Sequence, residues 1–182
     1  MTKRPVVLID GSNFYHGVKR CWPYFHTSNL DYINFARILT SHQDPEVIYY
    51  VGEIKRDISN AKTEALYSQQ QAVFYNLEHM GIEIKKGFIL QNGNNYTEKG
   101  VDVQIAVDLA VGAVKGRYDV AYLVSSDSDL VPAVKVATQE SKKVIYVAFE
   151  KFRSIALTVC SSQTYYVRFP TLKKAGTVNF KP

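Results

Sequence analysis

Short apolar runs rich in β-branched residues alternate along the chain with longer segments of helical periodicity. The apolar runs are nearly continuous, which is typical of strands that are covered on both faces of a sheet. Strands are predicted at residues 5–10, 46–52, 81–90, 118–126 and 143–149. Helices are predicted at residues 30–41, about 59–80, 102–115, 129–140 and 152–160. This alternation predicts a mostly parallel central sheet of about five strands between two layers of helices, a three-layer α/β/α sandwich.

The chain has 182 residues, a length that suits one domain with a sizeable core. We expect a single domain over residues 1–170. Residues 171–182 lack a core pattern and are expected to form a C-terminal tail. Residues 21–29 are interpreted as an insertion, and residues 91–100 as a polar loop with a turn signal at Asn92-Gly93.

Composition limits the function classes only mildly. The 22 basic residues exceed the 17 acidic ones, and a net charge of +5 permits a polyanionic partner without requiring one. Cys21 and Cys160 show no CxxC spacing, so neither a zinc site nor a disulfide framework is indicated. The N-terminal apolar run is too short for a signal peptide, and no stretch approaches the ~20 apolar residues of a membrane span. The sequence therefore predicts a soluble cytoplasmic protein.

Acidic residues follow the predicted strands where ligands bind in such folds. The first strand is followed by Asp10-Gly-Ser-Asn13, and the fourth ends in Ser-Ser-Asp127-Ser-Asp129. Asp102 opens a predicted helix directly behind Gly100 and Val101. Because parallel strands present their carboxyl ends at one edge of the sheet, these three segments are expected to meet.

Each acid also has a purely structural interpretation. Asp102 can stabilise a helix N-terminus through the helix dipole. Asp10 can belong to a turn before a helix cap, and Asp127 and Asp129 can be turn and cap residues. Structural roles alone do not explain why four acids should gather at one edge. Carboxylates ~6 Å apart repel each other by roughly 3 kcal/mol per pair at an effective dielectric of ~20. A divalent cation with hard oxygen ligands, Mg²⁺ or Mn²⁺, relieves that repulsion.

Helical periodicity separates two aspartates of the predicted helix 102–115. Asp102 leads a stripe of small and apolar residues, so its carboxylate is expected to lie over the sheet edge. Asp108 falls on the opposite side and is expected to face solvent or another helix. Other α/β chemistries lack their motifs, since GxGxxG, GxxxxGK[ST] and GxSxG are all absent.

Three motifs together resemble those of the NYN-domain family of PIN-like nucleases, in particular its LabA-like branch. They are VVLIDGSNF, KGVDVQIAVDL and YLVSSDSDLVPAVKVA, and the resemblance extends from about residue 5 to residue 150. It implies a PIN-like (Rossmann-like) topology and an acidic cluster that binds Mg²⁺ or Mn²⁺. Carried over by motif, the catalytic residues are Asp10, Asn13, Asp102, Asp127 and Asp129. The four aspartates are the implied metal ligands.

The resulting hypothesis is a divalent-metal-dependent nuclease, a ribonuclease that hydrolyses phosphodiester bonds of single-stranded RNA. Lys55, Arg56 and Lys99 flank the predicted strand edge and are the candidates for contacts to nucleic acid. A homo-oligomer is possible, and no membrane partner is expected. Two alternatives stay open: a non-catalytic regulatory module that binds metal and nucleic acid or protein, and a small-molecule phosphohydrolase.

Overall fold

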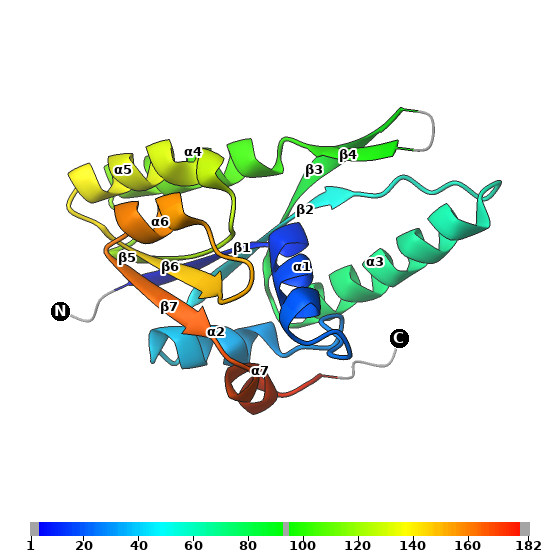
Figure 1. The fold of residues 1–182 in the computed structure, drawn as a ribbon, viewed down its shortest axis with the longest axis horizontal. Helices are drawn as coiled ribbons and strands as arrows, with labels where there is room; N and C mark the ends of the chain where they lie inside the picture. Colours follow the sequence, from blue (N-terminus) through cyan, green and yellow to red (C-terminus); the bar gives the residue numbers. More distant parts are fainter. Residues whose placement is uncertain (1–3, 93–94, 179–182) are drawn as a thin grey trace.

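The computed structural model describes residues 4–92 and 95–178 (Figure 1). Seven strands form one sheet in the order β4-β3-β2-β1-β5-β6-β7. Neighbouring strands are parallel except β3 and β4, which are antiparallel. The strands are β1 (Pro5–Asp10), β2 (Glu46–Glu53), β3 (Glu83–Asn92), β4 (Asn95–Lys99), β5 (Val120–Val124), β6 (Lys143–Phe149) and β7 (Gln163–Val167).

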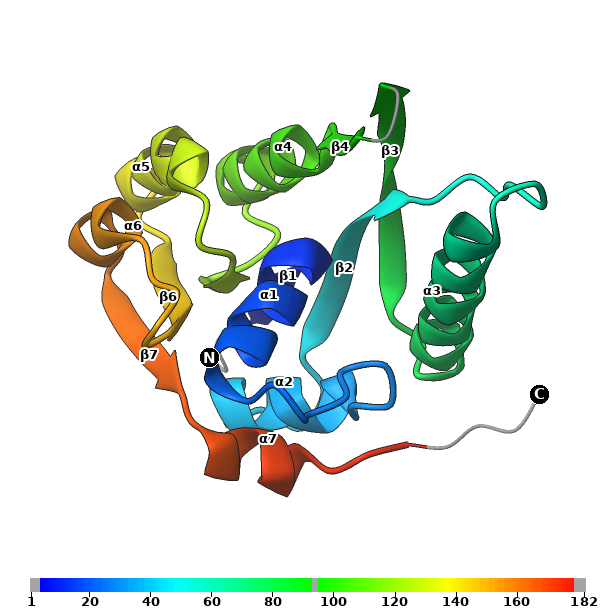
Figure 2. The same ribbon diagram turned by 45° about the vertical axis from the view of Figure 1, so that its right-hand side comes forward.

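Helices cover both faces of the sheet, as the two views in Figures 1 and 2 show. One layer packs α4, α5 and α6 on one face, and the other places α1, α2, α3 and α7 on the opposite face. The helices are α1 (Gly11–Cys21), α2 (Tyr32–Thr40), α3 (Ala61–His79), α4 (Val101–Val114), the 3₁₀ turn η1 (Ser128–Leu130), α5 (Val131–Gln139), α6 (Ile155–Cys160) and α7 (Phe169–Ala175). The predicted three-layer α/β/α sandwich is thereby confirmed.

Alternate residues of the central strands supply both hydrophobic cores. Val6 and Leu8 of β1 face the layer of α4, whereas Val7 and Ile9 face the layer of α1. All four side chains are buried, because β1 lies between β2 and β5 and is covered on both faces. This position brings the end of β1 and the end of β5 side by side at the centre of the sheet.

Four elements were not predicted from the pattern. Strand β4 lies in the segment predicted as a polar loop, and the short β7 lies beyond the last predicted strand. Helices α1 and α7 are also additional to the predicted ones. Asn92, the last residue of β3, pairs with Asn95, the first residue of β4, and Gly93 of the predicted turn lies outside the described residues.

The C-terminal segment differs from the expected tail over part of its length. Leu172 and Ala175 of α7 are buried in the core of the α1 layer, next to α2. Beyond the helix, the N–H of Val178 donates to the carbonyl oxygen of Asn29 over 2.7 Å. Residues 171–178 therefore pack against the body of the protein, and residues 179–182 lie outside the described residues. Within the described part of the chain, no helix is long and apolar enough to cross a membrane.

Candidate active site

Asp10 lies at the centre of the strand-end edge and is almost completely buried, with 1% of its surface exposed. It ends β1 and is the N-cap of α1, where its carboxylate accepts a hydrogen bond from the N–H of Asn13 (3.0 Å). The Asn13 side-chain amide donates a second bond (2.6 Å), and Ser125 Oγ donates a third (2.9 Å). Burial raises the pKa of Asp10, and these three hydrogen bonds partly offset that rise. The sequence placed Asp10 in a turn before the helix cap, whereas in the structure Asp10 is the cap itself and also lies at the strand edge.

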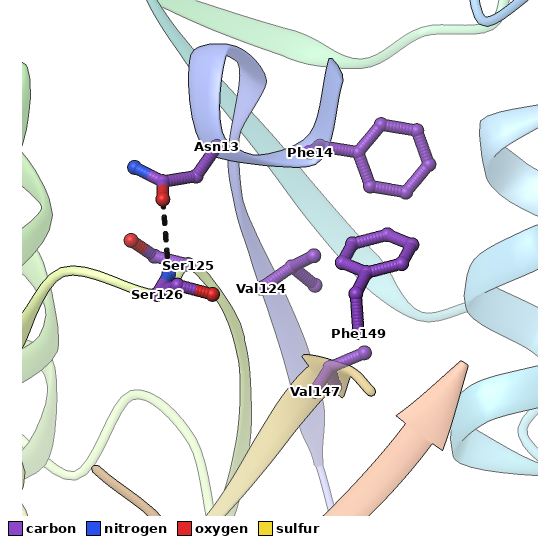
Figure 3. Close-up of a pocket in the computed structure, with 7 residues that line it drawn as sticks. All are labelled: Asn13, Phe14, Val124, Ser125, Ser126, Val147 and Phe149. Atoms are coloured by element: carbon purple, nitrogen blue, oxygen red, sulfur yellow. Dashed lines mark hydrogen bonds between the residues drawn. The ribbon is translucent and has the colours of Figure 1, made fainter. Parts of the chain in front are cut away.

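Asn13 joins the start of α1 to the end of β5. Its side-chain amide nitrogen contacts Asp10, while its side-chain oxygen accepts the N–H of Ser126 (3.2 Å). Figure 3 shows this bond and the aromatic rings of Phe14 and Phe149 on the core side of the same region. Because both ends of the Asn13 amide are engaged within the protein, this side chain fixes the orientation of Asp10.

Asp127 and Asp129 are held by the turn that follows β5. Asp127 caps η1, since its Oδ1 accepts the N–H of Asp129 (2.8 Å), and Asp127 N–H donates to Ser125 Oγ (3.2 Å). Pro132 then lies in the first turn of α5, as its position in the sequence predicts. Ser125 thus contacts Asp10 and Asp127 at once. Asp129 lies on the exposed side of this turn.

Asp102 reaches the same region from the first turn of α4. Its pKa is raised to about 6 by burial first, and then by the charges of Asp127, Asp10 and Asp129. A hydrogen bond to Asp127, which the protonated form of Asp102 donates, favours the neutral acid further. The structure therefore brings all four predicted aspartates within electrostatic reach of one another.

Glu98 is a fifth acid at this edge, and sequence reasoning missed it. It lies on β4, and its Oε2 accepts the N–H of Gly52 at the end of β2 (2.7 Å). Burial raises the pKa of Glu98, and the charge of Asp102 adds to the rise. The charge of Glu98 in turn raises the pKa of Asp10. A Cβ at Gly52 would lie 2.7 Å from the Glu98 side chain, so the glycine leaves room for this acid. The one sequence signal is the Asn-Gly turn, which is typical of a β-hairpin.

The donor chemistry of the cluster suits a hard divalent cation. Carboxylate and amide oxygens are the ligands that Mg²⁺ and Mn²⁺ prefer. Within the part of the chain that the structure describes, none of the five acids forms an ion pair with Lys or Arg. In the described part of the chain, no three His, Cys, Asp or Glu side chains are already arranged around a metal position. A bound cation would thus draw the carboxylates closer together. Its positive charge would offset the repulsion between their negative charges.

The prediction for Asp108 is wrong. Its Oδ2 accepts hydrogen bonds from the hydroxyl of Tyr50 (2.8 Å) and from Lys85 Nζ (2.7 Å), so the side chain lies over β2 and β3. It faces neither open solvent nor another helix. The ion pair with Lys85 gives Asp108 a structural role on the face of the sheet, away from the four aspartates.

The three basic residues proposed for nucleic acid differ in their surroundings. Lys55 and Arg56 follow β2, and Lys99 ends β4 next to Glu98; all three are exposed. Arg56 is held by Glu64 of α3, with an Nη2–Oε1 distance of 2.9 Å, and its guanidinium lies 5.9 Å from the ring centre of Tyr67. Part of the Arg56 charge is therefore neutralised within the protein.

An α/β/α sandwich with carboxylates gathered at the carboxyl ends of its central strands is consistent with a PIN-like fold. The family model of the NYN domain matches residues 4–169, and the chain belongs to this family of PIN-like nucleases. The match does not test the LabA-like branch, which stays a prediction.

A solved structure of similar fold is a protein of unknown function from Vibrio parahaemolyticus. It is 21% identical, with a TM-score of 0.68, over 92% of this chain and 94% of the other. At 21% identity, the similarity supports a shared fold only. No curated protein matches the chain.

Proposed function

We propose that this protein is a divalent-metal-dependent ribonuclease that acts on single-stranded RNA in the cytoplasm. The observation that carries the proposal is the convergence of Asp10, Asp102 and Asp127 from three separate segments at the strand edge of an NYN domain. Capping alone gives no reason to gather these charges, because each cap needs one carboxylate and the group repels itself. Asp10, Asp102, Asp127 and Asp129 would hold Mg²⁺ or Mn²⁺.

When bound, the cation supplies positive charge that polarises the scissile phosphate and lowers the pKa of an attacking water. The chain contributes preorganisation. Asn13 and Ser125 hold the Asp10 carboxylate in one orientation within a buried setting, so this one carboxylate needs no reorganisation when the substrate arrives. With a pKa of about 6, Asp102 would be mostly ionised at neutral pH and would hold the cation as a carboxylate. Asp129, on the exposed side, would orient the water, and no covalent nucleophile is required.

Lys55, Arg56 and Lys99 would contact phosphates of the strand on either side of the edge. Their exposure supports this role for Lys55 and Lys99, whereas the ion pair with Glu64 weakens the case for Arg56.

The test is cleavage of single-stranded RNA, duplex RNA and single-stranded DNA in Mn²⁺, Mg²⁺ and EDTA. We expect cleavage of single-stranded RNA that needs the metal and that is lost in Asp127→Asn. Asp108→Asn, which changes an aspartate of α4 outside the cluster, is the matched control and is expected to retain cleavage. Metal-dependent binding of RNA without any product would indicate a regulatory module. Turnover of a mononucleotide without cleavage of a strand would indicate a phosphohydrolase.

Metal binding itself is tested by thermal unfolding. A ligand that binds only the folded state stabilises it by about 2.7 kcal/mol at 100 times its dissociation constant. Mn²⁺ is expected to raise the melting temperature of the wild type and of Asp108→Asn equally, and to have a much smaller effect on Asp102→Ala. An equal effect on all three proteins would contradict the assignment of Asp102 to the site.

A further inference from the structure

A groove of about 710 Å³ lies beside the carboxylate cluster, on the sheet face that carries α1 and α3. Helix α1 forms one wall and α3 the other, β2 forms the floor, and residues 26–29 close the far end. Glu98 lines the groove at its near end and belongs to the cluster as well. The groove is therefore continuous with the candidate active site.

One face of α1 presents three different side chains along this groove: Ser12, Tyr15 and Lys19. They are three or four residues apart, so they share a side of the helix. Seven residues of helix rise by about 10 Å. That length matches about three stacked nucleotides at ~3.4 Å each.

Tyr15 is the exposed aromatic of this row, with 46% of its surface accessible. Lys19 Nζ lies 5.9 Å from the centre of its ring, and His16 contacts the ring edge-on at 5.3 Å between centroids. Tyr15 thus contacts neighbours on its own helix while nearly half of its surface stays accessible to a ligand. An aromatic face held in this way is a stacking platform for a base.

The ends of the groove carry charge of opposite sign. Glu98 marks the end where a cation would bind, and Lys19 lies toward the other end. Lys19 donates one hydrogen bond, to the carbonyl oxygen of Pro23 (2.8 Å), and its ammonium group has three N–H donors, so two are available for a phosphate. Gln69 of α3 and Asn29 of the closing segment also line the groove, and their neutral amides suit the polar edges of bases.

The walls are fixed before any ligand binds. Gln70 of α3 accepts the N–H of Ile54 (2.8 Å) and donates to the carbonyl oxygen of Gly52 (2.9 Å), which fastens α3 to the end of β2. A groove set between two helices admits a strand whose bases are free, whereas a duplex keeps its bases paired and stacked inside.

We propose that the groove between α1 and α3 is a base-binding subsite, in which Tyr15 stacks on a base of a single-stranded nucleic acid whose phosphate lies at the carboxylate cluster. This inference rests on the proposed function, because the strand can run from the carboxylate cluster into the groove only if its reacting phosphate lies at that cluster. The subsite makes the protein selective for unpaired strands and sensitive to the bases on one side of the reacting phosphate.

The test is a titration with short single-stranded RNAs that carry 2-aminopurine at successive positions, with Ca²⁺ in place of Mg²⁺ to suppress cleavage. In the wild type, stacking on Tyr15 is expected to quench the fluorescence at one or two adjacent positions. Tyr15→Ala is expected to bind about tenfold more weakly and to lose that quenching, whereas Tyr15→Phe keeps both. Tyr166→Ala, at an exposed tyrosine of edge strand β7, is the matched control and should bind as the wild type does.

Unchanged affinity and quenching in Tyr15→Ala would overturn the proposal. So would equal affinity of the wild type for the single strand and for its fully paired duplex, or for a mononucleotide. Cleavage assays in Mn²⁺ distinguish a failure of the proposed nuclease function from a failure of the proposed subsite. Quenching by Tyr15 without cleavage of any strand contradicts the proposed function alone, and cleavage with no Tyr15-dependent quenching contradicts the subsite alone.

Discussion

Ser125 and Asp10 are 115 positions apart in the sequence, and Ser125 Oγ donates a hydrogen bond of 2.9 Å to Asp10 Oδ2. Both side chains are buried, and the same Ser125 oxygen accepts the N–H of Asp127. One hydroxyl thus ties the end of β1 to the turn after β5. The position of the central carboxylate therefore depends on Ser125 as well as on Asn13, its neighbour in the chain.

Ser125→Ala is expected to destabilise the protein by about 1–3 kcal/mol, because a buried carboxylate loses one of its three donors and the N–H of Asp127 loses its acceptor. Urea denaturation measures this change. Ser128→Ala, at an exposed serine of the same turn, is the control and should remain within about 0.5 kcal/mol of the wild type. Equal stability of both variants and the wild type would show that the Ser125 bond does not contribute.

Asp102→Asn is expected to make metal-free stability less dependent on pH. The pKa of Asp102 is about 6 in the folded protein and about 4 when unfolded, so the folded state binds more protons between these values. Its contribution to stability is therefore fully present below pH ~4 and is lost as the pH rises through 6. Denaturation in EDTA at pH 5 and pH 7.5 should show the variant gaining on the wild type at the higher pH.

Asp119 is a control in which the pKa of the carboxyl group is lowered on folding, whereas that of Asp102 is raised. Arg4 holds the pKa of Asp119 at about 2, through hydrogen bonds from the Arg4 backbone N–H and side chain. Its charge therefore stabilises the fold above pH ~4, and this contribution is lost as the pH falls through 2. Asp119→Asn should lose stability relative to the wild type at pH 7.5. A gain in Asp119→Asn, or none in Asp102→Asn, would contradict the electrostatic description of the two ends of the sheet.

Glu98→Gln tests the acid that lies on β4. Glutamine retains an oxygen that can accept the N–H of Gly52, so the fold is preserved while one charge is removed. The Mn²⁺ concentration for half-maximal stabilisation is expected to rise about tenfold, as for residues that support metal ligands. Glu83→Gln, at an acid that starts β3, should leave it unchanged. If the wild type, Glu98→Gln and Glu83→Gln need the same Mn²⁺ concentration for half-maximal stabilisation, Glu98 does not contribute to metal binding.

Charge removal at Lys55 and Lys99 is expected to flatten the salt dependence of RNA binding by roughly one unit of slope per residue. Arg56→Ala should change the slope less, because Glu64 already neutralises part of its charge. Fluorescence anisotropy over a range of salt concentrations measures these slopes. A larger effect for Arg56 than for Lys55 would mean that the ion pair with Glu64 opens when RNA binds.

The sequence predicted the central strands and the acids at their ends because burial on both faces leaves a continuous apolar run. Strands β1 and β5 have such runs, and the polar residue that ends each run marks the edge of the sheet. Strand β4 has the sequence Asn-Tyr-Thr-Glu-Lys, which has no apolar alternation. Its pairing with β3 is a tertiary effect, and Glu98 could not be assigned without it.

The error at Asp108 has a different origin. Helix α4 is apolar on nearly every side, with Val103, Val107 and Val111 exposed while Leu109 is buried. In such a helix periodicity does not identify one buried face. The partners that settle the orientation are Tyr50 and Lys85, which belong to strands more than twenty residues earlier in the chain.

The position of β1 between β2 and β5 also determines at which stage of synthesis the carboxylate cluster can form. Synthesis proceeds from the N-terminus at ~5–20 residues per second, so Asp10 emerges seconds before its partners. The parallel register with β5 and the bond from Ser125 require a strand that ends at Val124. The cluster is complete only once Asp129 has been made. If the chain cleaves RNA, the messenger under translation meets no finished site until the codon for Asp129 has been read.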